Sequence, residues 1–351
     1  MLKLLLSLAL LSTLSFAQMF QTVPAQKAQL LQKSDAKMYC HACGMNLVKF
    51  YKTSHAYTKN GVTHQYCSLH CLVNENLHSD LIDAKVVDVS SLKFINAHDA
   101  YYVIGSSKPG TMTMNSKYAF ASQKDAKAFI KANGGKIYNF HEAVKIATND
   151  CAKNNKMIDK KRTMASKKGA MMLHKLCENK NIPEFHSFAK AKTYILAHGN
   201  CGTLKDKQAQ AIAIYLVKKA LPSQANPIVA PKDAKCPVCG MFVSKYPKWI
   251  AKITTKEHKE YYFDGNGDLM QFYFKSKENL DKIFVTDYYN ITAIPAKEAW
   301  YVIGSNIYGP MGDEIISFAS KADAQRFNAD HFGKKILSFD EITEDIVETL
   351  R

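Results

Sequence analysis

Short apolar runs alternate with turn residues toward the end of the chain. Residues 249–255 and 260–263 flank the polar stretch 256–258, which predicts a β-hairpin. Residues 267–274 predict a short helix. Three apolar, β-branched runs predict further strands at 283–287, 300–304 and 315–318. Strands and helices mixed in this order indicate the α+β class.

Four ordered blocks of sequence occur twice, at a nearly constant separation. Cys-x-x-Cys-Gly-Met is found at 40–45 and again at 236–241. Three later blocks return in the same order: Tyr-Val-Ile-Gly-Ser at 102–106 and 301–305, Phe-Ala-Ser at 120–122 and 318–320, and Ile, Phe and Glu at 137, 140 and 142 and at 336, 339 and 341. The chain therefore contains a duplicated domain.

Both copies also carry the same helix-start signal. Ser122 precedes Asp125 by three residues, and Ser320 precedes Asp323 in the same way. A serine side chain at this position can accept a hydrogen bond from the third backbone amide, so helices are predicted to begin at both sites.

A different, lysine-rich segment at 150–221 separates the copies and predicts helices. After Thr203, apolar residues recur at helical spacing at 209, 212, 213 and 216. The segment carries Cys151, Cys177 and Cys201, and we expect a Cys177–Cys201 disulfide. Its end resembles the last helix of a cytochrome c domain, but Cys-x-x-Cys-His occurs nowhere, so the segment is predicted to be a haemless helical insert.

The N-terminus has the features of a secretory signal. Lys3 precedes an apolar core at 4–14, and Ser15-Phe16-Ala17 forms a cleavage site, with an uncleaved anchor as the alternative. The chain is predicted to divide into a signal peptide at 1–17, a first domain at 37–148, the insert at 150–221, a proline-rich linker at 222–234 and a second domain at 235–351. The predicted location is the periplasm.

The chain has a formal net charge of +16, spread widely over lysines. No basic stripe with interleaved aromatic residues accompanies this charge, and the chain is predicted to be exported, so a nucleic-acid partner is not expected. A basic surface suits an acidic protein partner or the anionic surface of a membrane.

The repeated Cys-x-x-Cys-Gly-Met block points to copper. Cys40 and Cys43, like Cys236 and Cys239, place two thiolates on one tight turn, and Met45 and Met241 add a thioether to each turn. Thiolates and thioethers are soft ligands that select Cu(I) over harder cations. A thioether also cannot be lost to disulfide formation in an oxidising compartment.

A second methionine stands at an equivalent place in each copy. Met311 lies in a Gly-Pro-Met-Gly stretch between two predicted strands, and Met112 is its counterpart in the first copy. A single loop methionine is as often a core filler as a ligand. Because it occurs in both copies, we expect Met112 and Met311 to be copper ligands.

The first copy carries two further cysteines, Cys67 and Cys71. Aligned without gaps, residues 66–71 fall opposite 262–267, so these two thiols are private to the first copy. Together with the first turn they form a four-thiolate set. Three interpretations stay open: a closed structural zinc site, a Cu(I) site with spare thiols, and two disulfides. Three histidines are near enough in sequence to be ligands, at 41, 64 and 70.

These motifs resemble the NosL family of nitrous oxide reductase accessory proteins. The resemblance rests on residues 236–241, Tyr262-Phe263-Asp264, Trp300-Tyr301-Val302, Pro310-Met311-Gly312 and Phe318-Ala319, and on the matching blocks of the first copy. It implies a fold related to that of the organomercurial lyase MerB. It also implies a periplasmic copper chaperone, not an enzyme, whose partner is nitrous oxide reductase or its assembly machinery. The chain departs from the family pattern in lacking a lipid-bearing cysteine, in its duplication and in its insert.

Two other classes of function compete with the chaperone. A thiol–disulfide oxidoreductase would place its Cys-x-x-Cys at the start of a helix, whereas Gly-Met and a hairpin follow here. A mercury-handling lyase would need an acid beside the thiols, and Asp264 is the nearest candidate. A metal sensor or scaffold module is the remaining alternative.

Overall fold

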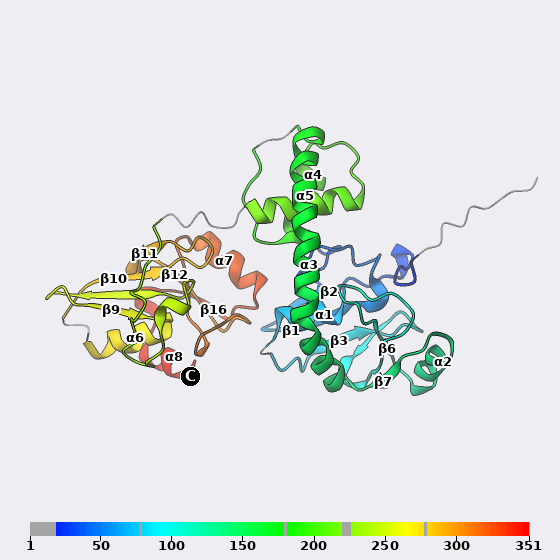
Figure 1. The fold of residues 1–351 in the computed structure, drawn as a ribbon, viewed down its shortest axis with the longest axis horizontal. Helices are drawn as coiled ribbons and strands as arrows, with labels where there is room; N and C mark the ends of the chain where they lie inside the picture. Colours follow the sequence, from blue (N-terminus) through cyan, green and yellow to red (C-terminus); the bar gives the residue numbers. More distant parts are fainter. Residues whose placement is uncertain (1–18, 78, 179–180, 220–225, 277–278, 351) are drawn as a thin grey trace, which may run out of the picture.

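The computed structural model describes residues 19–77, 79–178, 181–219, 226–276 and 279–350. The predicted signal peptide at 1–17 and the start of the predicted linker lie outside these residues. No helix in the described part of the chain is long and apolar enough to cross a membrane. The α+β class predicted from the sequence is confirmed (Figure 1).

Each copy of the repeat contains the same four-stranded antiparallel sheet. In the first repeat domain its strands are β1 His55–Lys59, β2 Val62–Tyr66, β3 Ala84–Val87 and β4 Phe94–Asn96. In the second they are β8 Ala251–Thr255, β9 Glu260–Phe263, β10 Leu280–Thr286 and β11 Ala293–Pro295. The orders are β2-β1-β3-β4 and β9-β8-β10-β11, so the topology is the same in both.

A three-stranded antiparallel sheet follows in each copy. Its strands are β5 Tyr101–Ile104, β6 Lys117–Phe120 and β7 Lys136–Tyr138 in the first domain, and β12 Trp300–Ile303, β15 Ile316–Phe318 and β16 Lys335–Ser338 in the second. The orders β6-β5-β7 and β15-β12-β16 again agree. The second domain adds a two-stranded hairpin, β13 Tyr308–Gly309 and β14 Gly312–Asp313, whose turn carries Met311.

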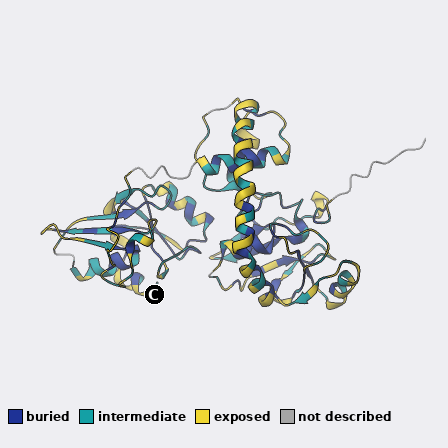
Figure 2. Cartoon of the chain, in the orientation of Figure 1, coloured by how far each residue is buried: buried dark blue, intermediate teal, exposed yellow. Residues whose placement is uncertain are grey.

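Two helices of each copy also correspond, α1 Leu69–Glu75 to α6 Asn266–Ser276 and α2 Gln123–Asn133 to α7 Lys321–Asp330. The second domain ends with a further helix, α8 Glu344–Thr349. The predicted caps are confirmed: the side chain of Ser122 accepts from the Asp125 amide at 3.1 Å, and that of Ser320 from the Asp323 amide at 3.1 Å. Figure 2 shows the buried residues concentrated inside both repeat domains.

The insert is built on one long helix that begins in the first repeat domain. Helix α3, Phe140–Leu176, starts with an Asn139–Glu142 capping box and runs without a break across the predicted boundary at residue 150. Its first half packs on the first domain through a buried face that includes Ala143, Ala147 and Cys151, and its second half leaves the domain (Figure 1).

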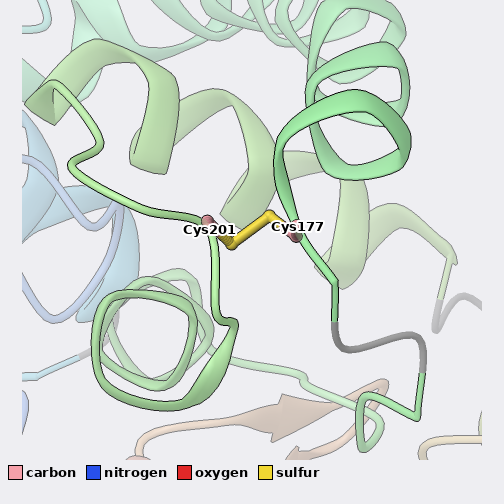
Figure 3. The surroundings of a disulfide bond; sticks show 2 residues. All are labelled: Cys177 and Cys201. Carbon is pink, nitrogen blue, oxygen red and sulfur yellow. A yellow bond between two sulfur atoms is a disulfide. The ribbon is translucent and has the colours of Figure 1, made fainter.

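Of two shorter helices, α5 Asp206–Lys219 packs against the far half of α3, and α4 Phe188–His198 packs on α5 (Figure 1). At Gly169 the approach is so close that an added Cβ would lie 2.0 Å from the carbonyl oxygen of Ala211. The predicted Cys177–Cys201 disulfide is confirmed and ties the end of α3 to the segment after α4 (Figure 3). The likeness of this insert to cytochrome c stays a prediction.

The second repeat domain docks on the first through the end of α7. Phe332 is fully buried and packs with the core of the first domain, between the rings of Tyr57 and His64. The side chain of Asn60 donates to the Phe332 carbonyl at 2.7 Å. Lys190 of the insert pairs with Asp330 at 2.8 Å, so all three parts of the chain meet here.

Candidate metal centres

The two Cys-x-x-Cys turns have the same backbone. The amide of Cys40 donates to the Met45 carbonyl at 2.8 Å, and that of Cys236 to the Met241 carbonyl at 2.9 Å. Gly44 and Gly240 both adopt positive φ, at 73° and 78°, where a side chain would be strained. We call residues 40–45 and 236–241 the first and second knuckles. Each turns its cysteines toward the start of the helix that follows the hairpin.

Four thiols meet at the first knuckle, as the sequence predicts. Cys40, Cys43, Cys67 and Cys71 are all buried, and their Sγ atoms lie within 4.8 Å of one another. The Sγ of Cys67 is 3.6 Å from that of Cys43 and 3.8 Å from that of Cys71. Hydrogen bonds, first from Cys40 and then from Cys67 and Cys71, hold the pKa of the Cys43 thiol well below its ordinary value. Burial raises the pKa of Cys67, so a metal entering the cluster must displace protons.

The three nearby histidines belong to other contacts. The rings of His41 and His64 stack at 3.6 Å between centroids, and their Nε2 atoms donate to backbone carbonyls of the second repeat domain. His70 turns toward α3, where its Nδ1 is 3.9 Å from the Sγ of Cys151. None of the three joins the four-thiol cluster among the described residues.

The methionines of the first domain lie beside the same core. Met45 and Met112 are partly buried and pack on the hydrophobic cluster that contains the four cysteines. The loop of Met112 is anchored there, because the hydroxyl of Thr53 lies 2.8 Å from the Cys67 carbonyl and 2.9 Å from the Thr111 hydroxyl. Their role as ligands stays a prediction.

At the second knuckle two carboxylates join the two thiols. The Sγ of Cys236 donates to Asp268 Oδ2 at 3.0 Å, and that of Cys239 donates to Asp264 Oδ1 at 3.2 Å. All four groups lie within 4.8 Å of one another, and both aspartates are buried. Burial raises the pKa of Cys236 to about 12, and burial with the neighbouring Asp264 raises that of Cys239. Both thiols of the metal-free site are therefore protonated at neutral pH.

The aspartates stand where the first domain has its extra cysteines. His55 pairs with Tyr66 in the first hairpin, whereas the equivalent Ala251 pairs with Phe263, because the second hairpin turn is one residue longer. This register corrects the ungapped alignment of the sequences by one position. Cys67 then corresponds to Asp264 and Cys71 to Asp268. The shared spacing of four residues is the signal in the sequence that could have revealed the pair.

A third acid, Glu314, lies beside the loop that carries Asp264. Glu314 is buried and accepts from the Gly267 amide at 2.8 Å and the Ile315 amide at 2.9 Å. Burial raises its pKa to about 7. Glu314 also touches Gly309, so it holds the β13–β14 hairpin against the loop that follows Asp264. Met311, at the tip of this hairpin, is 47% exposed and has no core to enter, while Met241 is partly buried.

Fold and sites together define a duplicated small domain whose thiol clusters fit a metal-binding protein. The NosL family model matches residues 32–147 and again residues 227–347, and the chain therefore belongs to the NosL family, with two copies of its domain. The copper-binding lipoprotein NosL of Stutzerimonas stutzeri is 24% identical over 141 residues, which cover 37% of this chain and 73% of that protein. The crystal structure of the copper chaperone NosL from Shewanella denitrificans is 30% identical, covers 35% of this chain and 98% of that chain, and has a TM-score of 0.32.

Proposed function

We propose that this protein binds Cu(I) at the second knuckle outside the cytoplasm and passes it to an enzyme under assembly, with nitrous oxide reductase or its assembly machinery as the client. Family membership supports this role, since the named relatives are a copper-binding lipoprotein and a copper chaperone. The residues offered by the second repeat domain fit soft-metal chemistry: thiols at Cys236 and Cys239, and thioethers at Met241 and Met311.

The openness of the second knuckle carries the proposal. Cys239 is only half-buried, and nothing lies within 4 Å of the place where a side chain on Gly240 would begin. A partner can therefore approach the thiol of Cys239 directly, whereas Cys236 lies buried behind it. Metal transfer between two proteins needs such access, because donor and acceptor ligands must share the ion during the exchange.

The protonated state of the free site suits capture and release. The raised thiol pKa values mean that Cu(I) binding displaces protons from Cys236 and Cys239. That cost lowers the affinity at neutral pH and keeps the ion available to a client with a better-matched site. The same shift argues against an oxidoreductase, whose attacking cysteine needs a lowered pKa.

The test is a Cu(I) titration of the reduced full chain against a chromophoric Cu(I) chelator. We expect Cys236→Ser with Cys239→Ser to remove one tightly held Cu(I). The matched control is Cys151→Ser, which deletes a buried thiol outside both clusters and should leave the stoichiometry unchanged. An unchanged copper stoichiometry in the double variant would refute the assignment. Turnover of a disulfide substrate by the wild type would favour an oxidoreductase instead.

A further inference from the structure

The four thiols clustered at the first knuckle, Cys40, Cys43, Cys67 and Cys71, are spaced to bind one tetrahedral metal ion. Sulfurs held about 2.3 Å from a tetrahedral zinc lie about 3.8 Å from each other. Two pairs in the cluster, Cys43–Cys67 and Cys67–Cys71, are 3.6 Å and 3.8 Å apart between Sγ atoms. A tetrahedral set of four thiolates is typical of zinc or an iron centre and not of Cu(I). All four side chains are buried, as in closed structural sites.

We propose that the first repeat domain holds one Zn²⁺ on Cys40, Cys43, Cys67 and Cys71, and that the insert seals this site so that its metal does not exchange. Each thiol that binds releases its proton to solvent, and no electron is transferred. The first domain would then be a structural module, and metal traffic would be confined to the second. This inference concerns other residues than the proposed function does. It can therefore be refuted while the proposed function stands.

The insert covers the first knuckle with its two short helices. The amide side chain of Gln210 on α5 donates to the Cys43 carbonyl at 2.9 Å. The ammonium of Lys192 on α4 donates to the Gly44 carbonyl at 3.1 Å. Phe188 lies directly over Gly44, where an added Cβ would be 3.0 Å from the Phe188 Cβ. The backbone of the knuckle is thus held and shielded from outside.

Lys192 is an unusual residue to bury, and its surroundings suggest why it is there. Its side chain has no exposed surface, and its ammonium lies 2.8 Å from Asp206 Oδ1 and 3.0 Å from Gln210 Oε1. Asp206 also pairs with Lys49 at 3.1 Å, so two cations share one carboxylate beside the knuckle. Four thiolates around one Zn²⁺ carry a net negative charge, and a buried anion needs such a counter-charge.

The second knuckle serves as an internal comparison. It has the same backbone and the same glycine at positive φ, yet among the described residues nothing lies within 4 Å of the place where a Cβ on Gly240 would begin. Two of its donors are carboxylates at Asp264 and Asp268. In the first copy the insert covers the knuckle and all four donors are thiols. In the second copy two donors are carboxylates, and the described residues leave Gly240 uncovered. This correlation is expected if the insert exists to retain the metal of the first site.

The first experiment measures metal content in the full chain purified under reducing conditions without added metal. We expect about one zinc ion per chain in the wild type. The Cys67→Ser, Cys71→Ser variant should lose it, and the Cys236→Ser, Cys239→Ser variant should keep it. Iron or copper in place of zinc would overturn the assignment. If the first variant does not fold, Co²⁺ replaces zinc in the wild type, where a four-thiolate site gives an intense tetrahedral spectrum and any other spectrum refutes it.

The second experiment tests the seal. Zinc release to a chromophoric chelator should be at least about tenfold faster in Lys192→Met than in wild type, in the range seen when partners behind metal ligands are removed. The control is Lys207→Met, which changes an exposed lysine of the insert on α5. The Co²⁺ spectrum of Lys192→Met should stay tetrahedral, which separates faster release from a damaged site. Equal zinc release rates in wild type and Lys192→Met would refute the proposal that the insert slows metal exchange at the first site.

Discussion

Asp268 occupies in the second repeat domain the position that Cys71 occupies in the first. Both lie in the first turn of the helix after the hairpin, and both lie close to the cysteines of their knuckle. The Sγ of Cys236 is 3.0 Å from Asp268 Oδ2, and Cys71 belongs to the four-thiol cluster. One scaffold thus carries two donor sets. The first is all sulfur, and the second is half sulfur and half oxygen, so the two should prefer different metals.

The carboxylates of the second site should affect divalent cations more than Cu(I). Oxygen donors are hard ligands and contribute little to a soft ion. We expect Asp264→Asn with Asp268→Asn to weaken Zn²⁺ binding there by about tenfold or more, roughly 1.4 kcal/mol, and to change Cu(I) affinity much less. Competition titrations of both metals provide the measurement, with Asp340→Asn as an exposed control. Equal losses for both ions would show that the carboxylates do not discriminate.

Met311 should contribute to copper affinity without contributing to stability. It is 47% exposed at the tip of the hairpin that Glu314 holds against the Asp264 loop. Met311→Leu keeps the volume and apolar character but removes the sulfur. We expect Cu(I) affinity to fall by about tenfold, roughly 1.4 kcal/mol, with an unchanged melting temperature of the metal-free protein.

The control for this prediction is Met164→Leu, which changes another exposed methionine, on α3. It should leave the Cu(I) affinity unchanged. If Met311→Leu and wild type bind Cu(I) equally, Met311 is not a ligand.

Phe332 should hold the two repeat domains together. It is fully buried between Tyr57 and His64 of the other domain. Truncation of a buried phenylalanine to alanine costs about 3–5 kcal/mol. We expect Phe332→Ala to release the docking, so that the radius of gyration from small-angle X-ray scattering increases while the folded content by circular dichroism stays the same. A compact Phe332→Ala variant would assign the docking to the polar contacts around it.

The docking should also weaken in acid. Burial lowers the pKa of His64 to about 2 and that of His331 to about 4, so both imidazoles are neutral at the interface. Their contribution is complete above their ordinary pKa of about 6.5 and is lost as the pH falls below it, because only the undocked state takes up the protons. The other titratable groups around these imidazoles are His41, Lys190 and Asp330.

The pKa of partly buried Glu75 shifts in the opposite sense. Burial raises its pKa to about 7, so it takes up a proton in the docked state as the pH falls. The two histidines outweigh this single acid, and we expect a net loss of about 1–2 kcal/mol from pH 7 to pH 5. Scattering across this range measures it. His331→Asn should make the docking nearly independent of pH, and an unchanged pH dependence in that variant would exclude His331 as its source.

Much of this protein could be predicted from local sequence patterns. The hairpin around residues 256–258, the helix caps at Ser122 and Ser320 and the Cys177–Cys201 disulfide are all present. Periodicity, caps and turns depend on residues a few positions apart, so a single stretch of sequence contains the information. The clustering of Cys67 and Cys71 with the first knuckle also followed from residue type and repeat alignment.

Only the tertiary structure decided which groups complete each site and which site is open. One extra residue in the β8–β9 turn moved Asp264 and Asp268 into the places of Cys67 and Cys71, because in a hairpin each added turn residue shifts every following partner. The hydrogen bond from Lys192 to the Gly44 carbonyl joins residues that are 148 positions apart in the sequence. The hydrogen bond from Asn60 to the Phe332 carbonyl joins residues that are 272 positions apart. Such contacts depend on how finished elements pack in space, and no periodicity within either segment records them.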